Sequence, residues 1–253
     1  MLTILAVSDQ KEESLLRLLE NRSEEIRRTV DIVISCGDLT AAYVELIASL
    51  TNKIVHYVLG NHHFEERSPD AREEPKRMSG IFSPGHDVPE ALDDAQRNIP
   101  GGINIHRTTI AEERFRLTGF EGSAWYNGED KQYTESEMSR AVRAVSRTLE
   151  FSSLGARMLG KKEPPLIAVS HAPIADVGDG RDRTHRGFKC FHPFIRRRNP
   201  ALWLHGHIHL DHYSKNAVFR VGETTVVNCF GYKFIRLNDD GTVRSTFDLN
   251  GIG

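Results

Sequence analysis

The first sixty residues alternate short apolar runs with amphipathic stretches. The runs at residues 2–7, 31–36 and 53–59 are largely apolar, which predicts buried strands. The segments between them, residues 11–28 and the stretch from Tyr43 to Leu50, carry apolar residues at helical spacing and predict helices. A β-α-β-α-β succession of this kind is typical of a parallel sheet with helices packed against it.

The remainder of the chain predicts further strands, at residues 103–110, 115–120, 165–169, 201–204, 219–221, 225–228, 233–237 and 243–249. Residues 134–158 form the clearest helix, because Thr134 and Glu137 match a capping box and apolar residues follow at helical spacing. Between residues 64 and 102, charged residues, Pro and Gly dominate. This composition predicts a mobile, solvated insertion within a single domain that spans residues 1–253.

The composition describes a globular protein and excludes collagen, coiled-coil and disordered classes. The chain has 253 residues, of which 39% are hydrophobic and 27% charged, enough to enclose a sizeable core. Its net charge of -2 offers no overall attraction to nucleic acid or to an anionic membrane. Nucleic acid is therefore a disfavoured partner. No apolar run approaches the roughly 20 residues of a bilayer-spanning helix. Three scattered cysteines fit a reduced compartment, so we expect a cytoplasmic protein.

Polar side chains follow several predicted strands at the point where each strand ends. They are Asp9, Asp38, Asn61, His62, His171, His207 and His209. Ligands of α/β folds bind at the carboxyl ends of strands, so we expect these side chains to face one another. Carboxylates, an amide and imidazoles without thiolate suit Mn²⁺, Fe or Zn²⁺ better than Ca²⁺ or Cu(I). The spacing of His207 and His209 lets them address two neighbouring ions, so one or two divalent cations are expected.

The order of these blocks resembles that of the calcineurin-like metallophosphoesterases. The family motifs D-x-H, G-D, G-N-H-D/E, H-x-x-P and G-H-x-H match, in this order, Asp9, Gly37-Asp38, Gly60-Asn61-His62, His171 with Pro173, and Gly206-His207-Ile208-His209. The segments GFEGSAWY, QYTESEM and HRGF also resemble a little-characterised branch of predicted phosphoesterases. The resemblance implies an α/β fold in which two mixed β-sheets pack face to face and are flanked by helices.

The same resemblance implies a role for each residue at the strand ends. Asp38 would bridge two metal ions, and His62 would stand beside the substrate as the proton donor. One metal site would be completed by Asn61, His171 and His207. The other would be completed by Asp9 and His209. Two cations so placed can clamp the phosphoryl oxygens while a metal-bound hydroxide attacks, and His62 can then protonate the leaving alkoxide.

We therefore expect a metal-dependent phosphoric ester hydrolase that acts on a small phosphodiester or nucleotide-like substrate. A nuclease that acts on nucleic-acid ends is an alternative, although its backbone-tracking groove would require clustered Lys and Arg. A non-catalytic sensor of a nucleotide or metal, derived from a phosphoesterase, is the other alternative. Trp125 and Tyr126 either stack on an aromatic substrate group or pack in the core.

Lys11 stands where the family motif D-x-H has a metal-binding His. A protonated amine has no lone pair for a metal and repels a cation at Asp9. Lys11 can turn towards solvent, pair with Asp9, or lose its proton and become a ligand. Lys11 and His185 are the candidate substrate-binding residues, although His185 can equally brace its loop. Ala41 stands where phosphoprotein phosphatases have an Asp that steadies the catalytic His, which disfavours a phosphoprotein substrate.

Overall fold

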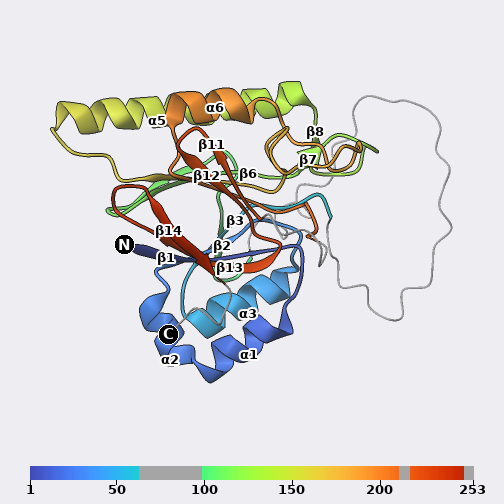
Figure 1. The fold of residues 1–253 in the computed structure, drawn as a ribbon, viewed down its shortest axis with the longest axis vertical. Helices are drawn as coiled ribbons and strands as arrows, with labels where there is room; N and C mark the ends of the chain where they lie inside the picture. The colour runs from blue at the N-terminus through green and yellow to red at the C-terminus, as the bar shows by residue number, and fades with distance from the viewer. Residues whose placement is uncertain (63–98, 211–216, 248–253) are drawn as a thin grey trace.

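The computed structural model describes residues 1–62, 99–210 and 217–247, and these form two mixed β-sheets that pack face to face (Figure 1). In spatial order, the first sheet contains β14 (Val243–Phe247), β13 (Gly231–Leu237), β1 (Leu2–Ser8), β2 (Ile32–Ser35), β3 (Val55–Tyr57) and β4 (Gly102–Asn104). The second contains β11 (Val218–Val221), β12 (Thr224–Asn228), β10 (Leu202–His205), β9 (Leu166–Ser170), β6 (Arg116–Phe120) and β5 (Thr109–Ala111). A short parallel pair, β7 (Ser123–Ala124) and β8 (Gln132–Tyr133), stands apart from both.

Helices cover the outer face of each sheet, as Figure 1 shows. The first sheet carries α1 (Glu13–Asn21), α2 (Ser23–Thr29) and α3 (Ala41–Thr51), and the second carries α5 (Glu135–Met158) and α6 (Phe191–Arg198). The predicted fold class, two mixed sheets flanked by helices, is confirmed. None of the helices in the described ranges is long and apolar enough to cross a membrane.

The central strands are buried on both faces, which explains why they read as continuous apolar runs. In β1, Ile4 points into the core between the two sheets, whereas Leu5 points to the opposite face and packs with α1 and α3. In β10, Leu204 joins the inter-sheet core, and Trp203 packs against α5 and α6. Successive residues of these strands therefore point alternately into the core between the sheets and towards the helices, because side chains alternate between the two faces of a strand.

The capping box predicted at the start of the long helix is present. The Thr134 hydroxyl accepts a hydrogen bond from the Glu137 backbone N–H at 3.3 Å, and the Glu137 carboxylate accepts one from the Thr134 N–H at 2.8 Å. Two orphan donors of the first turn are satisfied in this way, so the helix begins where the sequence indicates.

Two predicted elements are each divided in the structure. The expected helix over residues 11–28 is interrupted at Arg22, whose non-helical backbone separates α1 from α2. The expected strand over residues 103–110 is two strands in different sheets, because the chain turns between them. In that turn the side chain of Asn104 accepts a hydrogen bond from the His106 N–H, and Arg107 has a φ of 56°. The predicted insertion at residues 64–102 lies, up to residue 98, outside the described residues.

Candidate metal centre

The metal-ligand candidates lie where the carboxyl ends of strands from the two sheets face each other. The first sheet contributes the turn after β1 and the turn after β2, which are joined by a hydrogen bond from Asp9 N–H to the Gly37 carbonyl at 3.1 Å. The second sheet contributes the turns after β9 and β10. A backbone hydrogen bond of 3.1 Å from Gly206 to the His171 carbonyl joins those two turns. Four strand endings therefore converge, as parallel strands at one sheet edge require.

Three of the candidate residues adopt the left-handed backbone conformation that most side chains avoid. Asp9 has a φ of 64°, Asp38 of 55° and His207 of 67°. Such conformations cost free energy and persist where the surrounding structure imposes them, which is common at functional sites. Each of these residues lies within three positions of a strand end, where the left-handed conformation turns the chain out of the strand direction.

Asp38, Asn61 and His171 direct three electron-pair donors at one point. The His171 ring donates from Nδ1 to the Cys36 carbonyl at 2.8 Å, so its neutral form carries a lone pair on Nε2. That Nε2 lies 3.0 Å from Asn61 Oδ1 and 3.3 Å from Asp38 Oδ2. The Asn61 amide is oriented by a hydrogen bond from its Nδ2 to the Tyr126 phenol. In the metal-free protein a proton on Nε2 can bridge to these oxygens, and a cation that replaces this proton is bound by all three groups.

His207 completes this set from the second sheet. Its Nε2 donates to the Thr184 carbonyl at 2.7 Å, which leaves the lone pair on Nδ1. One ligand atom each from Asp38, His171 and His207 lies within 4.8 Å of the others, and all three side chains are buried. His171 and His207 thus each donate a hydrogen bond from one ring nitrogen to a backbone carbonyl, and the other nitrogen is available to a metal ion. Metal-bound imidazoles in proteins are commonly held in this way.

The charges at this cluster place one proton on His171 in the metal-free protein, at the point where a cation would bind. Burial disfavours a charge on Asp38, but His171 and several hydrogen bonds outweigh it and hold the pKa of Asp38 at about 2. Burial likewise disfavours a charged His171, yet the carboxylates of Asp38 and Asp9 raise its pKa to about 9. Burial lowers the pKa of His207 to about 3, so that ring is neutral. A carboxylate, an amide oxygen and two imidazoles fit Mn²⁺, Fe or Zn²⁺.

The second predicted metal site is less complete. The Asp9 carboxylate accepts the His207 backbone N–H at 3.0 and 3.1 Å, and burial raises its pKa. His209 Nε2 lies 3.7 Å from Asp9 Oδ1, but 65% of the His209 side chain is exposed. Lys11 is exposed and has no hydrogen bond or ion pair to another described residue. The structure therefore brings Asp9 and His209 together, and it turns the third position of the D-x-H motif towards solvent.

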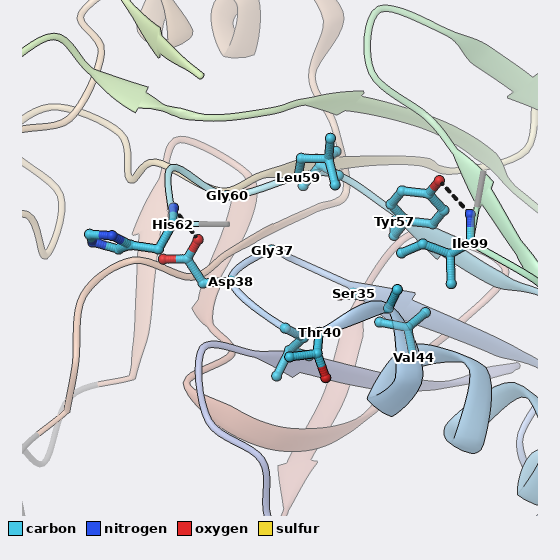
Figure 2. A pocket seen from close by; sticks show the side chains of 13 residues that line it. Ser35, Gly37, Asp38, Thr40, Val44, Tyr57, Leu59, Gly60, His62 and Ile99 are labelled. Carbon is cyan, nitrogen blue, oxygen red and sulfur yellow. Dashed lines mark hydrogen bonds between the residues drawn. The ribbon is translucent and has the colours of Figure 1, made fainter. Parts of the chain in front are cut away.

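His62 lies at the mouth of a cavity beside the metal centre (Figure 2). Its backbone N–H donates to Asp38 Oδ1 at 2.9 Å, and its exposed ring points away from that carboxylate. The cavity measures about 180 Å³, and its inner end is lined by Val44, Tyr57 and Ile99. The predicted proton donor is therefore anchored by its backbone next to the metal cluster, with a ring that is free to meet a ligand.

His185 lies beside His207, with their ring centroids 5.4 Å apart. Its Nδ1 lies 2.9 Å from Asp182 Oδ2, a contact that the sequence analysis did not predict. Two further contacts were not predicted: the hydrogen bond from His207 to the Thr184 carbonyl and the one from Asn61 to the Tyr126 phenol. The spacing of Asp182 and His185 in a loop rich in Gly and Asp was the available signal for the contact between them, whereas backbone carbonyls leave no signal in a sequence.

Known proteins provide an independent comparison. No curated protein matches the chain. A hypothetical protein from Thermus thermophilus superimposes with a TM-score of 0.52 at 12% identity, with 97% of each chain covered. TT1561 of the same organism gives a TM-score of 0.49 at 16% identity, with 97% of this chain and 98% of that chain covered. At 12% identity, the likeness to the hypothetical protein concerns the fold alone. The family model for calcineurin-like phosphoesterases matches residues 2–211, so the chain belongs to this family of metal-dependent phosphoesterases.

Proposed function

We propose that this phosphoesterase hydrolyses a small phosphodiester or nucleotide-like ester at a centre formed by Asp38, Asn61, His171 and His207. One observation carries the proposal: His171 Nε2 faces the oxygens of Asn61 and Asp38 at 3.0 and 3.3 Å. Buried acceptors are not left facing one another without a proton or a metal ion. The arrangement therefore supports a cation-binding role for all four residues.

A divalent cation bound here supplies a Lewis acid for the phosphoryl oxygens and lowers the pKa of water. The residues of the chain do the remaining work. A water molecule releases a proton to the solvent, and its oxygen forms a new bond to phosphorus while the ester P–O bond breaks. The His62 ring gives its proton to the departing alkoxide and regains one from the solvent. The hydrogen bond from the His62 backbone to Asp38 keeps that ring close to the ligand cluster. Asp9 and His209 would hold a second, weaker cation.

Two features support a small substrate, and two exposed side chains are candidate contacts for it. The cavity of about 180 Å³ beside Asp38 and His62 accommodates an organic group of modest size. The net charge of -2 does not favour a groove that follows a nucleic-acid backbone. His185 stands next to His207 with 42% of its side chain exposed, so it can reach a substrate at the metal. Lys11 is exposed near Asp9 and is the other candidate contact for a phosphate oxygen.

The proposal is tested by hydrolysis of bis-p-nitrophenyl phosphate and p-nitrophenyl phosphate with Mn²⁺. We expect activity in the wild type and a loss of at least about 100-fold in Asn61→Ala, because the variant lacks one ligand oxygen. Asn238→Ala is the matched control, since Asn238 donates to Thr242 in the turn between β13 and β14. Equal rates in wild type and Asn61→Ala would contradict the proposal.

A non-catalytic sensor is the second candidate, and two observations favour it. Lys11 removes a ligand from the Asp9 site, and no described residue hydrogen-bonds to the ring of His62. A sensor would bind Mn²⁺ with the same dependence on Asn61 and would hydrolyse neither ester under any divalent metal. Calorimetric Mn²⁺ titration beside the hydrolysis assay therefore separates the two functions.

A further inference from the structure

We propose that Asp182 is a positioning residue that serves the metal ligand His207 and the substrate-facing His185 at once. The inference rests on the proposed function, since it assigns His185 Nε2 to a phosphoryl oxygen of the substrate. Asp182 lies in the loop between β9 and α6, and none of the motifs at the strand ends includes it.

The Asp182 carboxylate collects three donors from the residues that follow it. Its Oδ1 accepts the backbone N–H groups of Thr184 at 2.9 Å and of His185 at 3.0 Å. Its Oδ2 lies 2.9 Å from Nδ1 of the His185 ring. A carboxylate accepts and cannot donate, so the proton at this contact is on Nδ1. Asp182 thus fixes the direction of the His185 ring. Its negative charge favours the imidazolium form of the ring, in which Nε2–H is the outward-facing donor.

The same carboxylate also fixes the peptide that orients His207. The His185 N–H, which shares a peptide group with the Thr184 carbonyl, donates to Asp182 at 3.0 Å, and that carbonyl accepts from His207 Nε2 at 2.7 Å. This hydrogen bond fixes the rotation of the His207 ring, which has one ligand atom within 4.8 Å of those of Asp38 and His171. A chain of two hydrogen bonds therefore connects an exposed carboxylate to a buried metal ligand. Outer partners of this kind commonly affect metal affinity by about 10- to 100-fold.

Bracing of the loop alone does not account for His185. The loop has two other braces, a hydrogen bond from Gly187 N–H to Asp179 at 3.0 Å and one from Gly180 N–H to the His185 carbonyl at 2.9 Å. The His185 ring is 42% exposed, contacts the His207 ring at 5.4 Å, and has no hydrogen bond from Nε2 to any residue in the described part of the chain. An oriented imidazole beside a metal ligand is placed to bind a phosphate oxygen.

Two variants of Asp182 separate its contacts. Asp182→Ala removes both acceptor oxygens and with them all three contacts, so we expect Mn²⁺ affinity to fall about tenfold by isothermal titration calorimetry. Asp182→Asn retains an Oδ1 for both backbone donors but loses the negative charge beside the ring. We expect its Mn²⁺ affinity to stay within about twofold of wild type. Asp240→Ala is the control, because Asp240 accepts the N–H of Thr242 in a turn remote from the metal centre.

The substrate contact is tested with inorganic phosphate and protein loaded with Mn²⁺. His185→Ala and Asp182→Asn should both bind phosphate about tenfold more weakly, since each loses the oriented donor, while His185→Ala binds Mn²⁺ as the wild type does. Unchanged phosphate binding in His185→Ala would overturn the substrate contact. Unchanged Mn²⁺ affinity in a folded Asp182→Ala would overturn the link to His207. If Asp182→Ala is unfolded at the assay temperature, Asp182→Asn provides the test. Weaker Mn²⁺ binding by Asp182→Asn would overturn the assignment of the backbone contacts to His207 and of the charge to His185.

These readouts do not depend on turnover, so the inference and the proposed function can fail separately. A wild type that hydrolyses neither ester, yet shows the expected losses of Mn²⁺ and phosphate affinity in the variants, would refute catalysis and leave Asp182 and His185 in their roles. The opposite result is also informative. If hydrolysis depends on Asn61 but all the Asp182 and His185 variants bind Mn²⁺ and phosphate as the wild type does, the proposed function stands and this inference is refuted.

Discussion

The side-chain amide of Asn61 donates a hydrogen bond to the phenol of Tyr126, with 3.1 Å between Nδ2 and Oη. This contact decides which end of the amide faces the metal centre, because Oδ1 is then turned to His171. Tyr126 is itself held by a backbone hydrogen bond to the Gln132 side chain at 3.0 Å. Burial raises the pKa of the Tyr126 phenol, so it stays neutral and its oxygen remains available as an acceptor.

Tyr126→Phe should weaken Mn²⁺ binding by about three- to tenfold, because the Asn61 amide loses the acceptor that opposes its rotation. Isothermal titration calorimetry measures the change. Trp125→Phe is the matched control, since Trp125 is the neighbouring aromatic residue and is 55% exposed. Equal Mn²⁺ affinity in the wild type and Tyr126→Phe would show that the amide is oriented without the phenol.

Gly60→Ala should abolish tight Mn²⁺ binding. A Cβ at Gly60 would lie 1.8 Å from Asp38 Oδ1, so the carboxylate would have to leave its position, and we expect an affinity loss of at least about tenfold. Gly155→Ala is the matched control, because nothing lies within 4 Å of a Cβ at that position of α5. The control should gain about 0.5–1 kcal/mol of stability. Retained Mn²⁺ affinity in Gly60→Ala would mean that Asp38 is not a ligand.

Much of the fold could be predicted from the sequence, because burial on both faces leaves a recognisable apolar run. The strands around Ile4 and Leu204 are examples, since each lies between a helical layer and the inter-sheet core. The turn at Arg107, which moves the chain from one sheet to the other, could not be predicted in this way. Local periodicity does not distinguish one strand from two that belong to different sheets.

The candidate site could be predicted as a set of residues but not as a geometry. Asp38, Asn61 and His171 were expected to meet because each ends a strand. Their orientation depends on groups without a motif, such as the carbonyl of Cys36 and the phenol of Tyr126. The incomplete Asp9 site could be anticipated from Lys11 in the sequence, whereas the exposure of Lys11 required the structure.

Mn²⁺ affinity should rise with pH because binding displaces a proton from His171. The carboxylates of Asp38 and Asp9 raise the pKa of His171 to about 9 in the metal-free protein, so the ring is protonated at neutral pH. The pKa of Asp38 is about 2 and that of His207 about 3, so neither exchanges a proton in this range. Affinity should therefore increase about tenfold per pH unit between pH 7 and 8 and level off above the pKa of His171.

Titration in buffers of different ionisation enthalpy measures the protons released on Mn²⁺ binding. We expect about one proton per ion at pH 7, and none in His171→Gln, which can bind only weakly. His205→Gln is the control, because burial lowers the pKa of that histidine to about 4 and it is already neutral. A flat dependence of affinity on pH would show that no buried imidazolium is replaced by the metal.

Lys11→His should restore a complete second metal site beside Asp9. The wild-type structure offers Asp9 and His209 there, with 3.7 Å between their nearest side-chain atoms, and an exposed ammonium at position 11. An imidazole at this position adds a lone pair and removes a positive charge that repels the cation. Elemental analysis after Mn²⁺ loading should therefore rise from about one ion per chain to about two, and ester hydrolysis should increase.

Lys11→Gln separates the two effects of that substitution. Glutamine removes the positive charge but supplies no imidazole, so it should raise the affinity of the second ion less than histidine does. Equal Mn²⁺ content in both variants would mean that charge repulsion, and not the missing ligand, keeps the second ion from binding. Two ions per chain in the wild type would show that Asp9, His209 and shared Asp38 suffice, and that Lys11, pointing to solvent, has no effect on the metal content.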